Sequence, residues 1–249
     1  MERKKKIAFV TGVSDGIGEA FTKILLQNGW EVIGISRNEQ KLNSFKKSIN
    51  SISNVFKSYK CDVQNIEKLK KIANENDAAN LLFLNAGIYN PIDSSKSNLE
   101  IYKEHINVNL LGVINCYEAF LPKMLEEGDG KIIIMSSISG WIGLPKAAAY
   151  GPTKAALRSF AQSIRYDLKP KGISVQICSP GFIETSATSV NDFYMPGLMK
   201  VEDAAKLIFK NMFKNKFEFS FPFIFSLFMK ILSVLPDKLS SFLIKKSIQ

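Results

Sequence analysis

The chain has 249 residues, 46% hydrophobic and 22% charged, so it can bury a sizeable core and is not an intrinsically disordered segment. It has three widely spaced cysteines and one histidine, which argues against a disulfide framework or a metal site and favours a reducing, cytoplasmic compartment. The net charge of +10 would attract polyanions, but the lysines are scattered and no nucleic-acid-binding motif is present, so we expect no nucleic acid partner.

Short apolar runs alternate with longer segments of helical spacing along most of the chain. The runs are aliphatic and bounded by turn residues, which predicts strands over residues 7–10, 31–35, 55–59, 81–84, 131–135 and 173–178. Helical spacing predicts helices over residues 17–27, 66–74, 99–125 and 153–168. Strands that alternate with helices of this length imply crossover connections, and therefore one α/β domain whose parallel sheet is covered on both faces.

A glycine-rich segment follows the first predicted strand and opens the first predicted helix. Glycine there permits a tight turn and close approach of the backbone to a pyrophosphate, and the helix N-terminus offers free N–H groups. A methyltransferase or an ordinary turn can carry a similar pattern, but the position between strand and helix favours a dinucleotide site. The predicted cofactor contacts in this segment are Gly12, Ser14, Asp15, Gly16, Ile17 and Gly18.

The end of the second predicted strand indicates which cofactor is bound. Dinucleotide-binding folds usually place an acidic residue here, where it binds the adenosine ribose hydroxyls. This chain instead continues Ser36-Arg37, and a planar guanidinium suits the 2′-phosphate of NADP(H). An exposed arginine without a ligand would look the same, but the missing acid favours NADP(H).

Tyr150 and Lys154 are four residues apart, so both project from one face of a predicted helix. Free tyrosine has a pKa of about 10, and a nearby ammonium group and a positively charged nicotinamide would lower that pKa. Pro152 between them is tolerated in the first turn of a helix. Ser137 follows the strand predicted at residues 131–135, at the edge where open α/β sheets bind ligands, although serines are also routine turn formers.

These residues belong to a series of seven motifs. They are Thr11 to Gly18, Asp62-Val63, Asn85-Ala86-Gly87, Asn107-Val108-Asn109-Leu110, Ser137, Tyr150 with Lys154, and Ser179-Pro180-Gly181. In this order and spacing, over residues 7 to about 185, the chain resembles the short-chain dehydrogenase/reductases. The resemblance implies a Rossmann-like, doubly wound sheet of seven mostly parallel strands in the order 3-2-1-4-5-6-7, with helices on both faces.

The resemblance also implies a role for each motif. Tyr150 would be the general acid/base, Ser137 would hydrogen-bond the substrate oxygen, and Lys154 would hold the nicotinamide ribose. Asn109 would anchor a water chain that returns protons to the site, which completes a catalytic quartet. Further cofactor contacts are implied at Asp62, Val63, Asn85, Ala86, Gly87, Pro180, Gly181, Ile183 and Thr185.

The function we expect is hydride transfer between NADP(H) and a carbonyl or alcohol substrate. A rival from another class is a non-catalytic NADP(H)-binding regulator or redox sensor, but it would not need the serine, tyrosine and lysine set that this chain retains. The substrate side is expected to come from residues 141–144, 182–183 and 186–199. Apolar residues there, such as Phe193 and Leu198, favour a hydrophobic substrate.

The segment after Pro222 is unusually apolar. We expect residues 1–222 to form the catalytic domain and residues 223–249 an apolar helical extension of it, as two short helices broken at Pro236-Asp237. Polar residues in 223–235 are Ser226, Lys230 and Ser233, which form one narrow stripe. The broad apolar face would pack on the domain, join subunits of a homodimer or homotetramer, or contact an anionic membrane on its cytoplasmic side, where Lys230, Lys238, Lys245 and Lys246 would meet the lipid.

Overall fold

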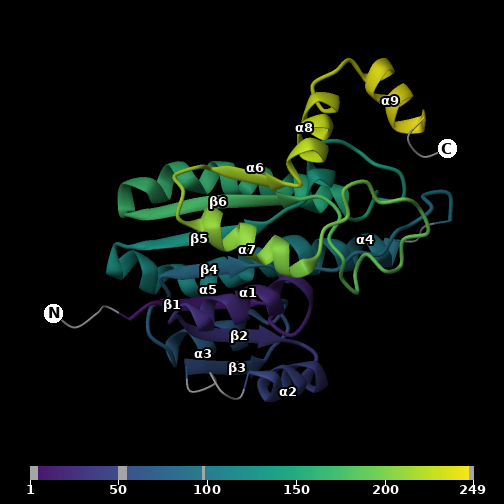
Figure 1. Cartoon of the computed structure of the whole chain (residues 1–249). Helices are drawn as coiled ribbons and strands as arrows, with labels where there is room; N and C mark the ends of the chain where they lie inside the picture. Colours follow the sequence, from purple (N-terminus) through teal and green to yellow (C-terminus); the bar gives the residue numbers. More distant parts are fainter. Residues whose placement is uncertain (1–4, 50–54, 97–98, 247–249) are drawn as a thin grey trace.

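A computed structural model describes residues 5–49, 55–96 and 99–246 of the chain. Within these residues, seven parallel strands form one sheet in the order β3-β2-β1-β4-β5-β6-β7 (Figure 1). This order is the one that the family resemblance predicts, so the predicted fold class is confirmed. The strands are β1 (Ile7–Thr11), β2 (Glu31–Ser36), β3 (Phe56–Lys60), β4 (Leu81–Leu84), β5 (Gly130–Met135), β6 (Ile173–Pro180) and β7 (Glu218–Phe221).

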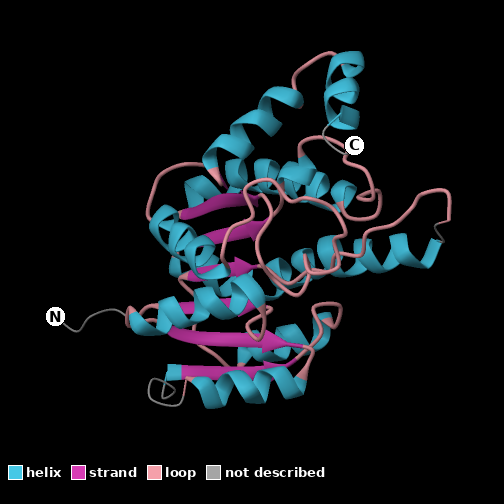
Figure 2. Ribbon diagram, turned by 45° about the vertical axis from the view of Figure 1, so that its right-hand side comes forward, coloured by secondary structure: helices cyan, strands magenta, loops and turns pink. Residues whose placement is uncertain are grey.

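Helices cover both faces of the sheet (Figure 2). On one face, Phe21, Phe45 and Ile208 belong to a single buried core, and on the other face Leu69 and Phe120 belong to a second. The first face is covered by α1 (Gly16–Gln27), α2 (Glu39–Ser48) and α7 (Val201–Met212), and the second by α3 (Ile66–Asn74), α5 (Gly112–Glu127) and α6 (Gly151–Leu168).

The central strands have apolar side chains on both of their faces because both faces are covered. All five residues of β1 are buried, with the sequence IAFVT. The strands are parallel, so their carboxyl ends meet at one edge of the sheet, and the loops that leave this edge carry most of the predicted site residues.

Three element predictions differ in detail from the structure. Strand β3 lies one residue further along than predicted. The alternation of apolar and polar residues over 217–221 predicts a last strand that closes the sheet, and this strand, β7, begins at Glu218 instead of Phe217. The helix predicted over 99–125 is three segments in succession, namely α4 (Leu99–His105), a π-helix (Ile106–Leu111) and α5. Helix α2 is not among the predicted helices, because only Leu42 and Phe45 of its ten residues are buried and its apolar signal is weak.

The segment after Pro222 forms two helices, α8 (Phe223–Leu232) and α9 (Asp237–Lys246), separated where the prediction places the break. Residues 247–249 of the predicted extension lie outside the described residues. In Figures 1 and 2 both helices project beyond the sheet and its covering helices. Met229 and Leu232 of α8 pack on Ile138, and Leu243 and Ile244 of α9 join this small cluster.

Candidate active site

A pocket of about 790 Å³ opens at the carboxyl edge of the sheet. The predicted site residues that line it are Gly12, Asp15, Gly16, Ile17, Asn85, Ala86, Gly87, Ser137, Tyr150, Lys154, Pro180, Gly181, Ile183 and Thr185. They come from the loops after β1, β4, β5 and β6 and from the start of α6. The pocket therefore brings together, from five parts of the chain, most of the residues that the sequence singles out.

The loop between β1 and α1 is fixed by close backbone contacts. Gly12 has φ +73° and Gly16 has φ +51°, a region that residues with a side chain rarely adopt. A Cβ on Gly18 would lie 2.7 Å from Asn85 Nδ2 and closer still to the Gly12 carbonyl oxygen. Thr11, which has no role of its own in the prediction, accepts hydrogen bonds at Oγ1 from the backbone N–H groups of Asn85 and Ala86, both at 2.8 Å. Gly16 and Ile17 at the start of α1 line the pocket, and the free N–H groups of a helix N-terminus suit the phosphates of a dinucleotide.

The end of β2 lies directly beside this loop. Ser36 Oγ is 2.6 Å from Ser14 Oγ, and both side chains are buried. Arg37 is exposed at the surface. Asp15 pairs with Lys41 of α2, a cation that the sequence analysis does not single out. An arginine and a lysine thus lie near the strand end where the acidic residue of NAD-binding folds usually stands.

Asp62, Val63 and Asn109 do not line the pocket. Asp62 follows β3 and accepts a hydrogen bond from the backbone N–H of Gln64 at 2.9 Å. Val63 is buried, and its carbonyl accepts from Asn115 Nδ2 at 3.0 Å.

Asn109 lies in the π-helix, with its side chain fully buried. Its Oδ1 accepts from the backbone N–H of Ile88 at 2.7 Å, and its Nδ2 donates to the Ile88 carbonyl at 2.9 Å. Nδ2 also lies 3.3 Å from Thr153 Oγ1 of α6. Asn109 therefore joins the chain after β4 to the helix that carries Tyr150 and Lys154. A π-helical turn at such a position is frequent at functional sites, and sequence spacing gives no signal for it.

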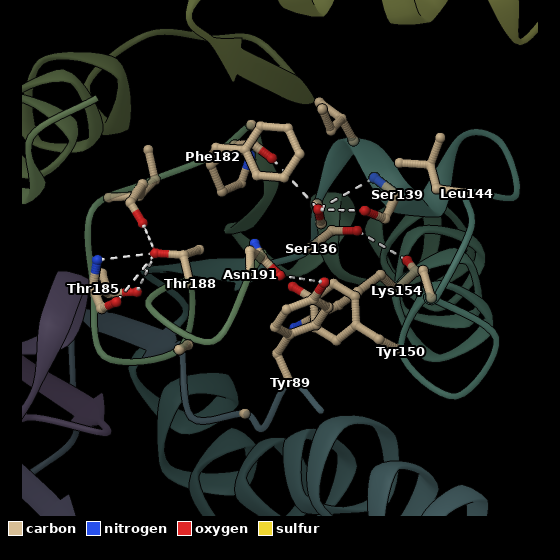
Figure 3. Close-up of a pocket in the computed structure, with 18 of the residues that line it drawn as sticks. Tyr89, Ser136, Ser139, Leu144, Tyr150, Lys154, Phe182, Thr185, Thr188 and Asn191 are labelled. Atoms are coloured by element: carbon tan, nitrogen blue, oxygen red, sulfur yellow. Dashed lines mark hydrogen bonds between the residues drawn. The ribbon is translucent and has the colours of Figure 1, made fainter. Parts of the chain in front are cut away.

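Tyr150 stands at the N-terminus of α6 and Lys154 lies one turn further on (Figure 3). Lys154 is 4% exposed, its Nζ donates to the Met135 carbonyl at 2.8 Å, and it lies 5.4 Å from the centroid of the Tyr150 ring. Burial lowers the pKa of Lys154 to about 8. Burial also raises the pKa of Tyr150 to about 12, and a hydrogen bond with Ser137 acts in the lowering direction. The protein groups alone therefore do not produce the lowered pKa of Tyr150 that the sequence analysis predicts.

Ser137 is buried at the end of β5, beside the pocket. Its Oγ accepts a hydrogen bond from the backbone N–H of Ser139 at 3.2 Å and lies 3.5 Å from the Pro180 carbonyl. The neighbouring Ser136 donates to the carbonyl of Lys154 at 2.9 Å and so ties β5 to α6. The Ser137 hydroxyl and the Tyr150 hydroxyl therefore face the same region of the pocket.

Residues 184–198, which we call the lid, cover the pocket, and Ser186 at their start contacts Asp15 of the phosphate loop. Their ends are fixed by a bridge between Ile183 and Met199. Between the ends, three polar contacts reach other parts of the chain: Ser186 Oγ to Asp15 Oδ2 at 2.8 Å, Tyr89 Oη to Asn191 Oδ1 at 3.0 Å, and Lys146 Nζ to Asp192 Oδ1 at 2.8 Å. Tyr89 also packs edge-on against Tyr150, with ring centroids 5.0 Å apart (Figure 3).

The substrate side differs from the prediction in two ways. Trp141 does not line the pocket, because its indole nitrogen donates to Glu218 Oε1 of β7 at 2.8 Å and its side chain turns away. Conversely, the prediction misses lining residues that only the tertiary structure brings in, namely Tyr89, Lys146, Phe225, Phe228, Met229, Leu232 and Ile244. Of the two apolar residues that the prediction names, Phe193 lines the pocket and Leu198 does not, and the walls are nevertheless largely apolar, as expected.

Comparison with known proteins agrees with this fold and site. A family model for short chain dehydrogenases matches residues 6–192. An uncharacterized oxidoreductase of Staphylococcus epidermidis is 34% identical over 191 residues, which cover 76% of this chain and 83% of that protein. The chain therefore belongs to the short-chain dehydrogenase/reductase family, and it is an oxidoreductase of that family.

Solved structures of the family have the same fold. A short chain dehydrogenase from Burkholderia cenocepacia in complex with NADP aligns with a TM-score of 0.84 at 24% identity, covering 98% of this chain and 99% of that chain. ElxO with NADP bound aligns with a TM-score of 0.77 at 25% identity, covering 87% and 97%. Another member, from Mycobacterium paratuberculosis, was solved bound to NAD. The fold thus binds a nicotinamide cofactor of either kind.

Proposed function

We propose that this chain transfers a hydride between NADP(H) and an apolar carbonyl or alcohol substrate, with Tyr150 as the general acid/base. One observation carries the proposal: Tyr150 and the buried Lys154 meet Ser137 in a pocket that also contains the phosphate loop. Burial of the Lys154 ammonium group costs solvation free energy. A regulator that only senses the cofactor would not need such a buried lysine.

The protein groups would divide the chemistry as follows. The Tyr150 hydroxyl gives its proton to the carbonyl oxygen during reduction, and Ser137 donates a hydrogen bond to the same oxygen. A bound nicotinamide supplies the hydride and accepts it in the reverse direction. Lys154 holds the nicotinamide ribose. Burial raises the pKa of Tyr150, and a positive charge next to the Tyr150 hydroxyl lowers it again. Asn109 helps return a proton to the site along a chain of waters.

The cofactor proposal rests on the end of β2. Arg37 is free to form a charge-assisted contact with the 2′-phosphate of NADP(H), and Lys41 lies within reach of the same region. Asp62 and Val63 would bind the adenine, and Ser14 and Ser36 the ribose beside it. The test is titration with NADPH and with NADH, followed by nicotinamide fluorescence. Tighter NADPH binding is expected, and a preference for NADH would overturn this part of the proposal.

The substrate class follows from the walls of the pocket. Phe182, Phe193 and Phe225 form a continuous aromatic contact between the lid and α8, with centroid separations of 5.8 and 5.7 Å. Such walls favour an apolar carbonyl compound over a sugar. Screening ketones, aldehydes, acyl thioesters and steroids, with NADPH oxidation as the readout, tests the reaction. Failure of every class to support turnover would reject it.

Assembly and location are further proposals. We propose that residues 223–249 are an extension of the domain formed by residues 1–222 and that the chain acts in the cytoplasm. A homodimer or homotetramer is expected because most soluble oligomers are built from identical chains. Among the described residues, no helix combines the length and the apolar character needed to cross a membrane. Light scattering on the full chain measures the number of subunits.

A further inference from the structure

Helix α8 turns its polar stripe toward the protein. Ser226 is only 3% exposed, although it is one of the few polar residues of the helix. Lys230 bends back over the ring of Trp141, 5.4 Å from the centroid, and lies 3.6 Å from Glu218 Oε2. Glu218 is itself nearly buried and is held by Trp141, Ser179 and Arg158, so the partners of Lys230 are fixed. Ser226 and the ammonium group of Lys230 therefore lie on the side of α8 that faces the protein.

The opposite side of α8 carries large apolar side chains in contact with solvent. Ile224 is 83% exposed, and Leu227 and Ile231 follow it at helical spacing. Val234, two residues after the end of α8, continues this spacing and is 79% exposed. Phe223, 74% exposed, extends the same surface. We call these five residues the outer face of α8. Soluble monomers rarely leave such a continuous apolar surface uncovered, so a partner is expected.

The charge around the outer face indicates what covers it. Lys238 and Lys245 are exposed in the tail, whereas Asp237 is the single acidic residue in 223–246. A second copy related by twofold symmetry would bring these lysines toward one another. An anionic lipid surface would complement them, because lysine side chains beside a buried apolar helix face can reach lipid headgroups.

The geometry fits a helix that lies in the plane of a membrane surface. α8 and α9 have 10 residues each, which makes each helix about 15 Å long, half of the roughly 30 Å hydrocarbon thickness. Both project beyond the body of the protein in Figures 1 and 2. The side chains of the outer face are exposed, so they are accessible to a flat surface.

The inner side of the same helix forms a wall of the pocket. Phe225, Met229 and Leu232 line it, and so does Phe228, which is still 45% exposed. Across the pocket, Tyr194 of the lid also lines it and is 86% exposed. The pocket therefore opens between the lid and α8, next to the outer face. A protein copy seated there would obstruct this opening, whereas a lipid surface can itself dissolve apolar molecules and deliver them.

We propose that the outer face of α8 docks on an anionic lipid bilayer and that the substrate enters the pocket from the lipid. The substrate would then be an apolar carbonyl compound or alcohol that partitions into membranes. The docking stands on the geometry of the tail alone, while the route of the substrate rests on the function proposed above.

Flotation with vesicles tests the docking. The full chain should float with vesicles of phosphatidylcholine mixed with phosphatidylglycerol, and much less with phosphatidylcholine alone or at high salt. The double variant Phe223→Ser/Ile224→Ser should bind roughly tenfold more weakly, because membrane affinity scales with the apolar area buried. Neither residue lines the pocket. The matched control is Phe213→Ser, since Phe213 is 62% exposed but follows α7 at the other end of the sheet.

Two results would overturn the docking. One is a full chain that floats with neither kind of vesicle. The other is a dimer, by light scattering, that the double variant converts to a monomer, which would assign the outer face to a second copy. Flotation does not depend on turnover, so the two proposals are tested separately. Failure of the carbonyl screen would reject the proposed function, and only the flotation and light-scattering results decide the docking.

Discussion

The cofactor side and the substrate side of the pocket are held in place by different kinds of contact. On the cofactor side, backbone lies against backbone, and Gly18 has no room for even a Cβ beside Gly12 and Asn85. On the substrate side, the lid meets the rest of the chain through side chains such as Asn191 and Asp192. Close backbone contacts cannot adjust without moving whole elements, whereas a side-chain contact breaks by rotation about one bond. We infer that the cofactor side is a rigid template and that the lid can adapt to different substrates.

Gly18→Ala tests the rigid side most severely. The added methyl group would collide with the Gly12 carbonyl, so we expect loss of NADPH binding and destabilisation by about 1–3 kcal/mol. Fluorescence titration and thermal unfolding measure the two effects. Gly143→Ala is the matched control, because a Cβ there meets nothing within 4 Å and stability should change by less than about 0.5 kcal/mol. Equal behaviour of the two variants would show that the loop is not rigid.

Lys154→Met tests the charge buried between the two sides. Burial depresses the pKa of Lys154 from 10.5 to about 8, so between these values the unfolded chain binds the proton that the folded chain has lost. The stability of the native chain should therefore rise with pH, relative to the variant, by about 2–3 kcal/mol from pH 7 to pH 10.

Urea unfolding of both proteins across this pH range measures the difference. Tyr150 and the other titrating groups are present in both proteins and largely cancel. A difference in stability that does not depend on pH would mean that Lys154 is not desolvated in the folded protein.

Arg37→Ala tests the proposed contact with the 2′-phosphate, at the adenosine end of the cofactor side. A hydrogen bond to a charged group contributes about 1.5–3 kcal/mol, so NADPH should bind roughly 10- to 100-fold more weakly. NADH has no 2′-phosphate, and its affinity should not change, which makes it the internal control. Equal weakening of both cofactors would instead indicate a general disturbance of the β2–α2 region.

Lys146→Ala should have the smallest effect, because it removes one exposed contact of the lid. The pair with Asp192 is exposed, so solvent screens it and its loss should weaken the lid contact only slightly. We expect KM for a carbonyl substrate to rise by up to roughly fivefold while kcat is little changed. Lys70→Ala removes a similar exposed pair with Glu67 on α3 and should leave both constants unchanged. A large fall in kcat for Lys146→Ala would show that the lid is part of the rigid template.

The same contrast explains how far the sequence predicts the molecule. Glycine requirements and the spacing of Tyr150 and Lys154 are local, so the phosphate loop, the catalytic helix and the strand order can be predicted from the residues and the family resemblance. The orientation of α8 cannot, although its polar stripe is visible in the sequence. The partners that turn this stripe inward include Trp141 and Glu218, and Trp141 is 89 residues from Lys230 in the chain.

Long-range contacts explain the other differences as well. Trp141 follows Ser137 closely in the sequence, yet the carboxylate of Glu218 draws its indole away from the pocket. Tyr89 becomes part of the site only because its hydroxyl donates a hydrogen bond to Asn191, which lies in a distant loop. Side-chain contacts of this kind depend on the finished fold, and single-sequence patterns do not contain them.

The central claim is that Tyr150 moves the proton while the rest of the pocket binds the cofactor. The most direct test is Tyr150→Phe, which removes one oxygen atom and keeps the ring that packs against Tyr89. With a substrate found in the carbonyl screen, turnover should fall by roughly 10²- to 10⁴-fold. NADPH affinity should stay within about threefold of the native value, since the phosphate loop and Lys154 are intact. Undiminished turnover by the Tyr150→Phe variant would contradict the account.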